Sequence, residues 1–143
     1  MLIKQLSVFI ENKPGRMSEI TETLCKNRID IRALSIADTT DYGILRLIVN
    51  KPEEALEALK QDGITVSLTN VIAIAIPDVT GGLDKAVKAL SSQGIEIEYM
   101  YAFLNPKSQS AFVILRVEDN EKAIASLQAG GIEILKSEDI YAI

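Results

Sequence analysis

The sequence contains no histidine and no tryptophan, and it has a single cysteine, Cys25. Without histidine there is no imidazole base and no histidine-containing metal site. One cysteine forms neither an intramolecular disulfide nor a multi-thiolate zinc site, which favours a reducing, cytoplasmic compartment. No nucleophile–base pair and no cofactor motif is present in the sequence. We therefore expect no catalytic residues, no metal site and no cofactor, and a protein that is not an enzyme.

Long apolar runs and excess positive charge are also missing. No run approaches the ~18–20 residues of a membrane span, and residues 1–5 read as the start of a strand rather than as a signal peptide. The net charge of -5 offers no basic surface for nucleic acid or for an anionic membrane. Hydrophobic residues at 48% and charged residues at 24% are typical of a globular protein.

The two halves of the sequence repeat each other. Residues 10–31 match residues 76–97 at an offset of 66, and residues 47–72 match residues 115–140 at an offset of 68. A two-residue insertion between 104 and 110 explains the change and belongs in a turn. The repeat predicts two domains, residues 1–69 and 70–143. Their boundary should be tight, because no Gly/Ser/Pro-rich linker separates them.

Hydrophobic spacing within each half switches between the two-residue period of a strand and the 3.6-residue period of a helix. The order is strand, helix, strand, strand, helix, strand. In the second half the expected elements are residues 71–76, 81–93, 95–103, 110–117, 121–128 and a strand from 131 onward. This order predicts an α+β fold of two tandem ferredoxin-like βαββαβ units, with antiparallel sheets and the helices on one face.

The sheet face away from the helices is expected to be unusually apolar for a solvated face. Side chains along a strand alternate between the two faces of the sheet. If Ile31 and Ala33 face the helices, a second set of side chains faces away from them. This set comprises Leu34, Ile36, Ile44 and Ile48 in the first half and Met100, Ala102, Phe112 and Ile114 in the second. A second chain would cover such a face, so we expect a homodimer or a larger homo-oligomer.

The turn between the first strand and the first helix, residues 12–16, is the strongest local signal of a site. Gly15 allows a ligand to approach the backbone closely. The start of the helix presents unpaired N–H groups that suit a carboxylate, and the Asn12 amide can both donate and accept. A structural role, with Asn12 capping the helix and Gly15 making the turn, explains the same residues. The spacing leaves both interpretations open.

The segment from Glu11 to Met17, followed by residues 28–31 at the start of the second strand, resembles the ACT domain. ACT domains are small βαββαβ regulatory modules that bind amino acids between two adjacent modules. Residues 77–83 and 94–97 form the second copy of the likeness, which covers the whole chain twice. The chain as a whole resembles the stand-alone tandem ACT domain proteins of bacteria, which carry no catalytic domain.

The resemblance implies which residues contact a ligand. They are Asn12, Lys13, Pro14, Gly15, Arg16, Met17, Asp30 and Ile31 in the first copy, and Asp78, Gly81, Gly82, Leu83 and Glu96 in the second. An ionised Asp78 replaces Asn12 and would repel a carboxylate, so the first copy is the better candidate. The implied function is a non-catalytic regulatory or sensor protein that binds a free amino acid. The alternative is a structural or protein-interaction module without a small-molecule ligand.

Overall fold

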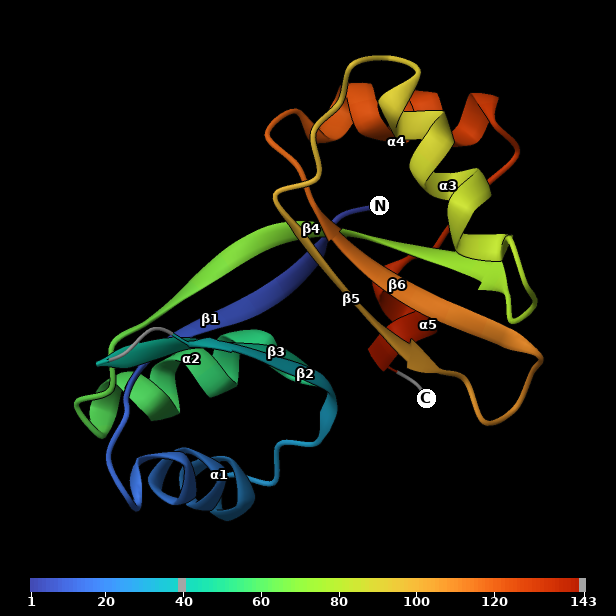
Figure 1. The fold of residues 1–143 in the computed structure, drawn as a ribbon. Coiled ribbons are helices and arrows are strands. Elements are labelled where there is room, and N and C mark those ends of the chain that lie inside the picture. The colour runs from blue at the N-terminus through green and yellow to red at the C-terminus, as the bar shows by residue number, and fades with distance from the viewer. Residues whose placement is uncertain (39–40, 142–143) are drawn as a thin grey trace. The chain divides into compact units, whose positions relative to one another are not determined.

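The computed structural model describes residues 1–38 and 41–141 (Figure 1). They form two compact units. The first unit contains Lys4–Thr69 together with Ile140 and Tyr141, and the second contains Asn70–Asp139 together with Met1–Ile3. The two units correspond broadly to the two sequence repeats.

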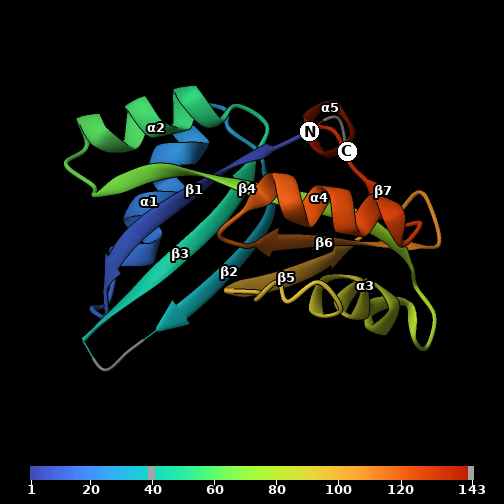
Figure 2. The ribbon, with the colours of Figure 1, turned by 90° about the horizontal axis from the view of Figure 1, so that it is seen from above.

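The first unit is a four-stranded antiparallel sheet with two helices on one face (Figures 1 and 2). Its sheet order is β2-β3-β1-β4. The Phe9 N–H donates to the Thr65 carbonyl at 2.9 Å and joins β1 to the segment that leads into β4. The elements are β1 (Ile3–Glu11), α1 (Arg16–Lys26), β2 (Ile31–Asp38), β3 (Tyr42–Val49), α2 (Pro52–Gln61) and the beginning of β4 (Val66–Pro77).

The second unit repeats this arrangement, with the sheet order β7-β4-β6-β5. Strand β4 therefore ends the first βαββαβ unit and also begins the second. After β4 the elements are α3 (Gly82–Ser91), β5 (Tyr99–Leu104), β6 (Ser110–Arg116), α4 (Asn120–Ala129) and β7 (Glu133–Ile134). The predicted fold class, two tandem ferredoxin-like units, is confirmed.

The end of the chain differs from the prediction. A strand was expected from residue 131 onward, but β7 has two residues and is followed by the short helix α5 (Ser137–Tyr141). The Asp139 carboxylate accepts the Lys136 N–H at 2.9 Å and closes the first turn of this helix. The hydrophobic spacing of so short a segment does not distinguish a strand from one helical turn.

Each unit has its own core between the helices and the sheet. In the first unit the core is formed by Leu6, Val8, Ile10, Ile20, Leu24, Ile29, Leu45, Leu47, Val49, Ala55 and Leu59. In the second it is formed by Ile72, Ile74, Ile76, Ala86, Leu90, Val113, Leu115, Val117, Ala123, Leu127 and Ile132. Most of these side chains are aliphatic and hold a strand-spaced or helix-spaced position. Burying each of the larger side chains contributes roughly 1.5–3 kcal/mol to the stability of the fold.

Strand β2 contains a register shift that the sequence alternation does not reveal. Ile31 pairs with Val49, whereas Ala33 pairs with Ile48, the neighbour of Val49. The side chains of two paired residues in an antiparallel sheet point to the same face. The odd-numbered side chains of β2 therefore point to one face of the sheet at Ile31 and to the other face at Ala33. All side chains of β2 after this point lie on the face opposite to the one that strict alternation predicts.

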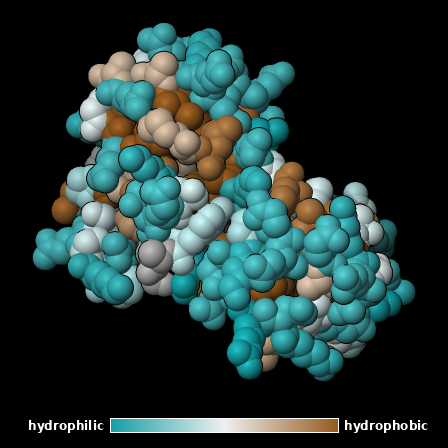
Figure 3. Space-filling model, turned by 180° about the vertical axis from the view of Figure 1, so that it is seen from behind, coloured by the Kyte–Doolittle hydropathy of each residue, from teal (hydrophilic) through white to brown (hydrophobic). Residues whose placement is uncertain are grey.

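The expected orientation of Leu34 and Ile36 is consequently wrong. They pair with Leu47 and Leu45 and lie on the helix-facing side of the sheet. Because β2 is the outermost strand, the helices leave them 50% and 51% exposed. Figure 3 shows apolar residues reaching the surface of both units among polar neighbours.

The second copy shows the same change of face. Met100 and Ala102 pair with the core residues Leu115 and Val113, so they also face the helices and not the opposite side. The remaining members of the expected outward set keep the predicted face, but several are buried in the single chain. Ile48 and Ile114 have no exposed surface, and Phe112 is 6% exposed.

The turn after α1 contains a strained residue. Arg28 has a φ of 57°, and the equivalent residue of the second copy is Gly94, with a φ of 68°. A left-handed conformation costs a non-glycine residue roughly 1–2 kcal/mol. Replacement by glycine would remove this cost, but part of the gain is offset because glycine has greater freedom in the unfolded chain.

Arg28→Gly should therefore raise the free energy of unfolding by about 0.5–1 kcal/mol, measured by urea denaturation. Arg28→Ala, which keeps the strain, is the control; equal stability of both variants would contradict this explanation.

Candidate functional site

The turn between β1 and α1 adopts the same backbone in both copies. Gly15 is the N-cap of α1 with a φ of 87°, and Gly81 is the N-cap of α3 with a φ of 88°. Glycine has no side chain with which to cap a helix, and neither N-cap makes a side-chain cap hydrogen bond. A Cβ atom built on Gly15 or Gly81 would have no atom within 4 Å. The backbone at this position is open to an approaching molecule.

Hydrogen bonds from a neighbouring hairpin hold this turn in both copies. The Asn12 N–H donates to the Asp41 carbonyl at 3.1 Å, and the Asp78 N–H donates to the Gln109 carbonyl at 3.0 Å. The equal anchoring explains why the two turns keep one conformation although Thr80 stands in place of Pro14.

The first turn of α1 determines which amides are free for a ligand. The Arg16 N–H already donates to the Lys13 carbonyl at 3.3 Å, and the first i to i−4 bond of the helix runs from the Glu19 N–H to the Gly15 carbonyl at 3.0 Å. The two amides between them, Met17 and Ser18, have no acceptor within the helix. These two amides, unlike that of Arg16, are left for an acceptor outside the helix.

Ion pairs surround the turn. Lys13 Nζ lies 3.0 Å from a carboxylate oxygen of Glu11, and Arg16 Nη1 lies 3.1 Å from Glu19 Oε2. The hydrogen bond and charge of Lys13, followed by the charge of Arg16, hold the pKa of the Glu11 carboxyl below its ordinary value. All four side chains are well exposed, so solvent screens these pairs strongly.

The strand-opening residues lie at the other end of α1. Asp30 exchanges two hydrogen bonds with Asn50: the Asp30 N–H donates to Asn50 Oδ1 at 2.9 Å, and the Asn50 N–H donates to the Asp30 carbonyl at 3.1 Å. Arg32 Nη1 lies 3.7 Å from Asp30 Oδ2. The 11 residues of α1 span about 16 Å. The structure therefore does not bring Asp30 and Ile31 together with the turn of their own unit.

The second copy has the same separation. Asp78 and Gly81 precede α3, Gly82 and Leu83 are its first two residues, and Glu96 follows it. The 10 residues of this helix span about 15 Å. Asp78, Gly81, Leu83 and Glu96 are exposed, and Gly82 is half-buried. A Cβ atom at Gly82 would lie 2.4 Å from the Pro77 carbonyl oxygen, so this glycine is required for close packing of the turn.

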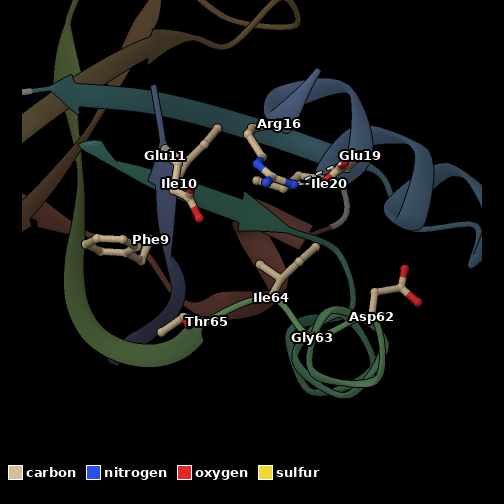
Figure 4. Close-up of a pocket in the computed structure, with 10 residues that line it drawn as sticks. All are labelled: Phe9, Ile10, Glu11, Arg16, Glu19, Ile20, Asp62, Gly63, Ile64 and Thr65. Atoms are coloured by element: carbon tan, nitrogen blue, oxygen red, sulfur yellow. Dashed lines mark hydrogen bonds and ion pairs between the residues drawn. The ribbon is translucent and has the colours of Figure 1, made fainter. Parts of the chain in front are cut away.

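A pocket of about 310 Å³ opens beside the start of α1 (Figure 4). Arg16 is the predicted site residue that lines it. The opposite wall is the turn after α2, Asp62–Thr65, which the sequence analysis did not identify. One signal was available, because Gly63 matches Gly131 in the repeat and both have positive φ angles, 76° and 75°.

A second pocket, of about 450 Å³, lies at the equivalent place in the second unit. The predicted residues Gly81 and Gly82 line it, together with Thr80 and Lys85 on the same side. Gly131, Ile132 and Glu133 form the opposite side, as the turn after α2 does in the first unit.

Two kinds of feature are absent from the part of the chain that the structure describes. Residues 1–38 and 41–141 contain no group of three or more Cys, Asp or Glu side chains placed to hold a metal ion. None of the helices described here is long and apolar enough to cross a membrane.

Comparisons with known proteins agree with this architecture. The whole sequence, residues 1–143, matches the family of ACT domain pairs, and the chain belongs to this family. ACT domains are regulatory rather than catalytic modules. The crystal structure of protein BT0572 from Bacteroides thetaiotaomicron is 43% identical, with a TM-score of 0.94; the match covers 100% of this chain and 98% of that one.

More distant structures share the fold. The regulatory subunit of aspartate kinase from Thermus thermophilus is 21% identical with a TM-score of 0.64, over 90% of this chain and 93% of that one. The corresponding subunit from Thermus flavus is 19% identical with a TM-score of 0.64, over 92% of each chain. A search of curated proteins found no match.

The pairing of Glu11 with Lys13 can be tested by titration. In Lys13→Ala the pKa of Glu11 should rise toward its ordinary value, because the largest cause of its lowering is removed. A lowered carboxyl pKa stabilises the fold above the unfolded-state pKa, and this contribution is lost as the pH falls through the folded-state pKa. NMR titration of the side-chain carboxyl carbon measures the change. Lys26→Ala, which removes the pair with Glu22, is the control and should leave Glu11 unaltered.

Proposed function

We propose that this chain is a non-catalytic regulatory or sensor protein that binds a free amino acid between two ACT modules. We infer that each sequence-defined half, residues 1–69 and 70–143, is one such module. The observation that carries the proposal is the turn before α1: an exposed left-handed glycine, with the unpaired amides of the helix start next to it. This is a geometry suited to a carboxylate.

The proposed ligand bonds use the two ends of the zwitterion. The α-carboxylate accepts from the Met17 and Ser18 amides, with Asn12, Lys13, Pro14 and Gly15 forming the surrounding turn. The α-ammonium binds near Asp30 and Ile31. Because these two sets lie at opposite ends of an 11-residue helix, one amino acid cannot contact both in a single module. The proposal therefore requires the turn of one module and the strand opening of another.

The second copy should bind more weakly. Its turn, with Asp78, Gly81, Gly82 and Leu83, has the same backbone as the first, but the Asp78 carboxylate repels an incoming carboxylate. Glu96 takes the place of Asp30 and keeps a negative charge for an ammonium. The two sites would thus differ in affinity and not in overall geometry.

A second copy of the chain is the partner that we propose for the edge of the first unit. Strand β2 ends the sheet order, so its outer backbone groups are unpaired by any other described strand. Leu34 and Ile36 lie half-exposed beside this edge. Antiparallel pairing of two β2 strands about a twofold axis would satisfy the backbone hydrogen-bonding groups of this edge and bury both side chains.

We also propose a cytoplasmic location. The single, exposed Cys25 is compatible with it.

Ligand binding is tested by thermal shift against the twenty amino acids. A ligand at a hundredfold excess over its dissociation constant should stabilise the protein by about 2.7 kcal/mol. Isothermal titration with the best ligand and with its carboxamide then tests the carboxylate contact. Equal affinity for both would show that the carboxylate does not bind at the helix start. Failure of all twenty amino acids to bind would favour the alternative function, a protein-interaction module.

The location of the site is tested by Gly15→Val, which places a branched side chain in the open space before α1. Gly94→Val is the matched control, since Gly94 also has a positive φ angle, 68°, and no atom within 4 Å of its built Cβ. Both variants carry a similar backbone strain, of roughly 1–3 kcal/mol. Only Gly15→Val should lose the ligand-dependent stabilisation. Normal binding by Gly15→Val would place the ligand elsewhere.

The proposed dimer is tested by Leu34→Glu combined with Ile36→Glu. Placing carboxylates in an apolar interface is costly, so this variant should be monomeric by light scattering at micromolar concentration, whereas the unmodified protein should be dimeric. Val79→Glu is the control, because Val79 is 67% exposed and lies in the turn before α3. A monomeric unmodified protein, or a dimeric double variant, would contradict the assignment of β2.

A further inference from the structure

We propose that two charged residues of β2 determine how two copies of this chain pair along that strand: Arg32 of each copy forms an ion pair with Asp38 of the other. The pairing rests on the β2 dimer proposed above. It adds the direction of the two strands, their register and a physical reason why β2 does not pair with another edge. It uses residues of the first unit alone and requires no bound ligand.

Arg32 has no hydrogen-bonded carboxylate among the residues that the structure describes. Its Nη2 donates to the Tyr141 carbonyl at 3.1 Å, and its Nη1 lies 3.7 Å from Asp30 Oδ2, too far for a hydrogen bond. Its Nε is buried without a hydrogen-bond partner in the same part of the chain. A guanidinium has five N–H donors, and 22% of this side chain is exposed. Arg32 can therefore bond to a carboxylate of another molecule.

Asp38 supplies such a carboxylate at the other end of the strand. It is the last residue of β2 and is exposed, and no Lys or Arg of residues 1–38 and 41–141 forms an ion pair with it. The five residues between Arg32 and Asp38 are uncharged. Strand β2 thus carries one cation near its start and one anion at its end.

This charge pattern favours an antiparallel pair of strands. In an antiparallel dimer the start of one β2 lies beside the end of the other, so twofold symmetry forms the pair between Arg32 and Asp38 twice. A parallel dimer would instead set Arg32 against Arg32 and Asp38 against Asp38. Like charges directly opposite each other on neighbouring strands are destabilising.

The same ion pair selects a register. When Arg32 of one copy lies opposite Asp38 of the other, Leu34 lies opposite Ile36, and both of these side chains face the helices. A shift of two residues is the smallest that keeps every side chain on its own face. In one direction it sets Leu34 against Asp38. In the other it brings Asp38 toward Asp30, a second carboxylate.

Strand β5, the outermost strand of the second unit, does not offer the same charges. In the repeat, Glu98 directly before β5 takes the place of Arg32, and Leu104 takes the place of Asp38. Equivalent pairing of β2 with β5 of another copy would set Asp38 against Glu98, and Arg32 would have no anion opposite it. The charges therefore oppose a head-to-tail contact, which can continue into open chains, and favour the closed pair of β2 strands.

Two variants of the full chain and their mixture test this pairing. Arg32→Glu and Asp38→Lys each set like charges against each other in both ion pairs of a homodimer. The dimer dissociation constant of each should rise about tenfold or more, measured by sedimentation equilibrium. An equimolar mixture should regain the dimer, because a mixed dimer contains one native pair and one pair with both charges reversed.

The controls are Glu57→Lys and Lys60→Glu, which make the same changes of charge at exposed positions of α2 and should dimerise normally. Failure of the mixture to dimerise, with both variants folded by circular dichroism, would overturn the ion pair. Asp38→Lys alters an exposed side chain, so its unchanged dimerisation would overturn the ion pair even if Arg32→Glu does not fold. In either case, loss of the dimer in Leu34→Glu combined with Ile36→Glu would leave the β2 dimer itself in place. A monomeric unmodified protein would overturn both proposals.

Discussion

The packing of two helices on one face of an antiparallel sheet determines which turns lie next to each other in each unit. Strands β1 and β3 are antiparallel, and each is followed by a helix that returns along the sheet. The start of α1 therefore lies beside the end of α2, and opposite ends of the two helix dipoles lie close together. The turn before α1, the turn after α2 and the pocket between them all follow from this one arrangement.

Hydrophobic periodicity and the internal repeat were enough to predict most of the core and the order of elements as far as β7, but not the helix α5 that follows it. The change of face in β2 could not be predicted in this way. Leu34 and Ile36 continue the sequence alternation after Ala33, and only the pairing with β3 reveals that the register has shifted. A bulge is a relation between two strands, and a pattern within one strand does not contain it.

The candidate site was predictable to a similar extent. The turn at Gly15 follows from local sequence, because a glycine directly before a helix-spaced segment commonly marks a positive φ angle. The opposite wall of the pocket, Asp62–Thr65, is separated from Arg16 by most of the first repeat and becomes its neighbour only through the packing of α1 on the sheet. The matched glycines Gly63 and Gly131 were the single sequence feature that pointed to this wall.

The two copies combine one backbone conformation with different side chains. Gly15 and Gly81 hold the same left-handed conformation, and the turns around them have equivalent anchoring bonds. The side chains differ in charge, as in Asn12 and Asp78. Because the backbone supplies the geometry and the side chains supply the charge, a substitution can alter the charge of one turn while the conformation of both turns is kept.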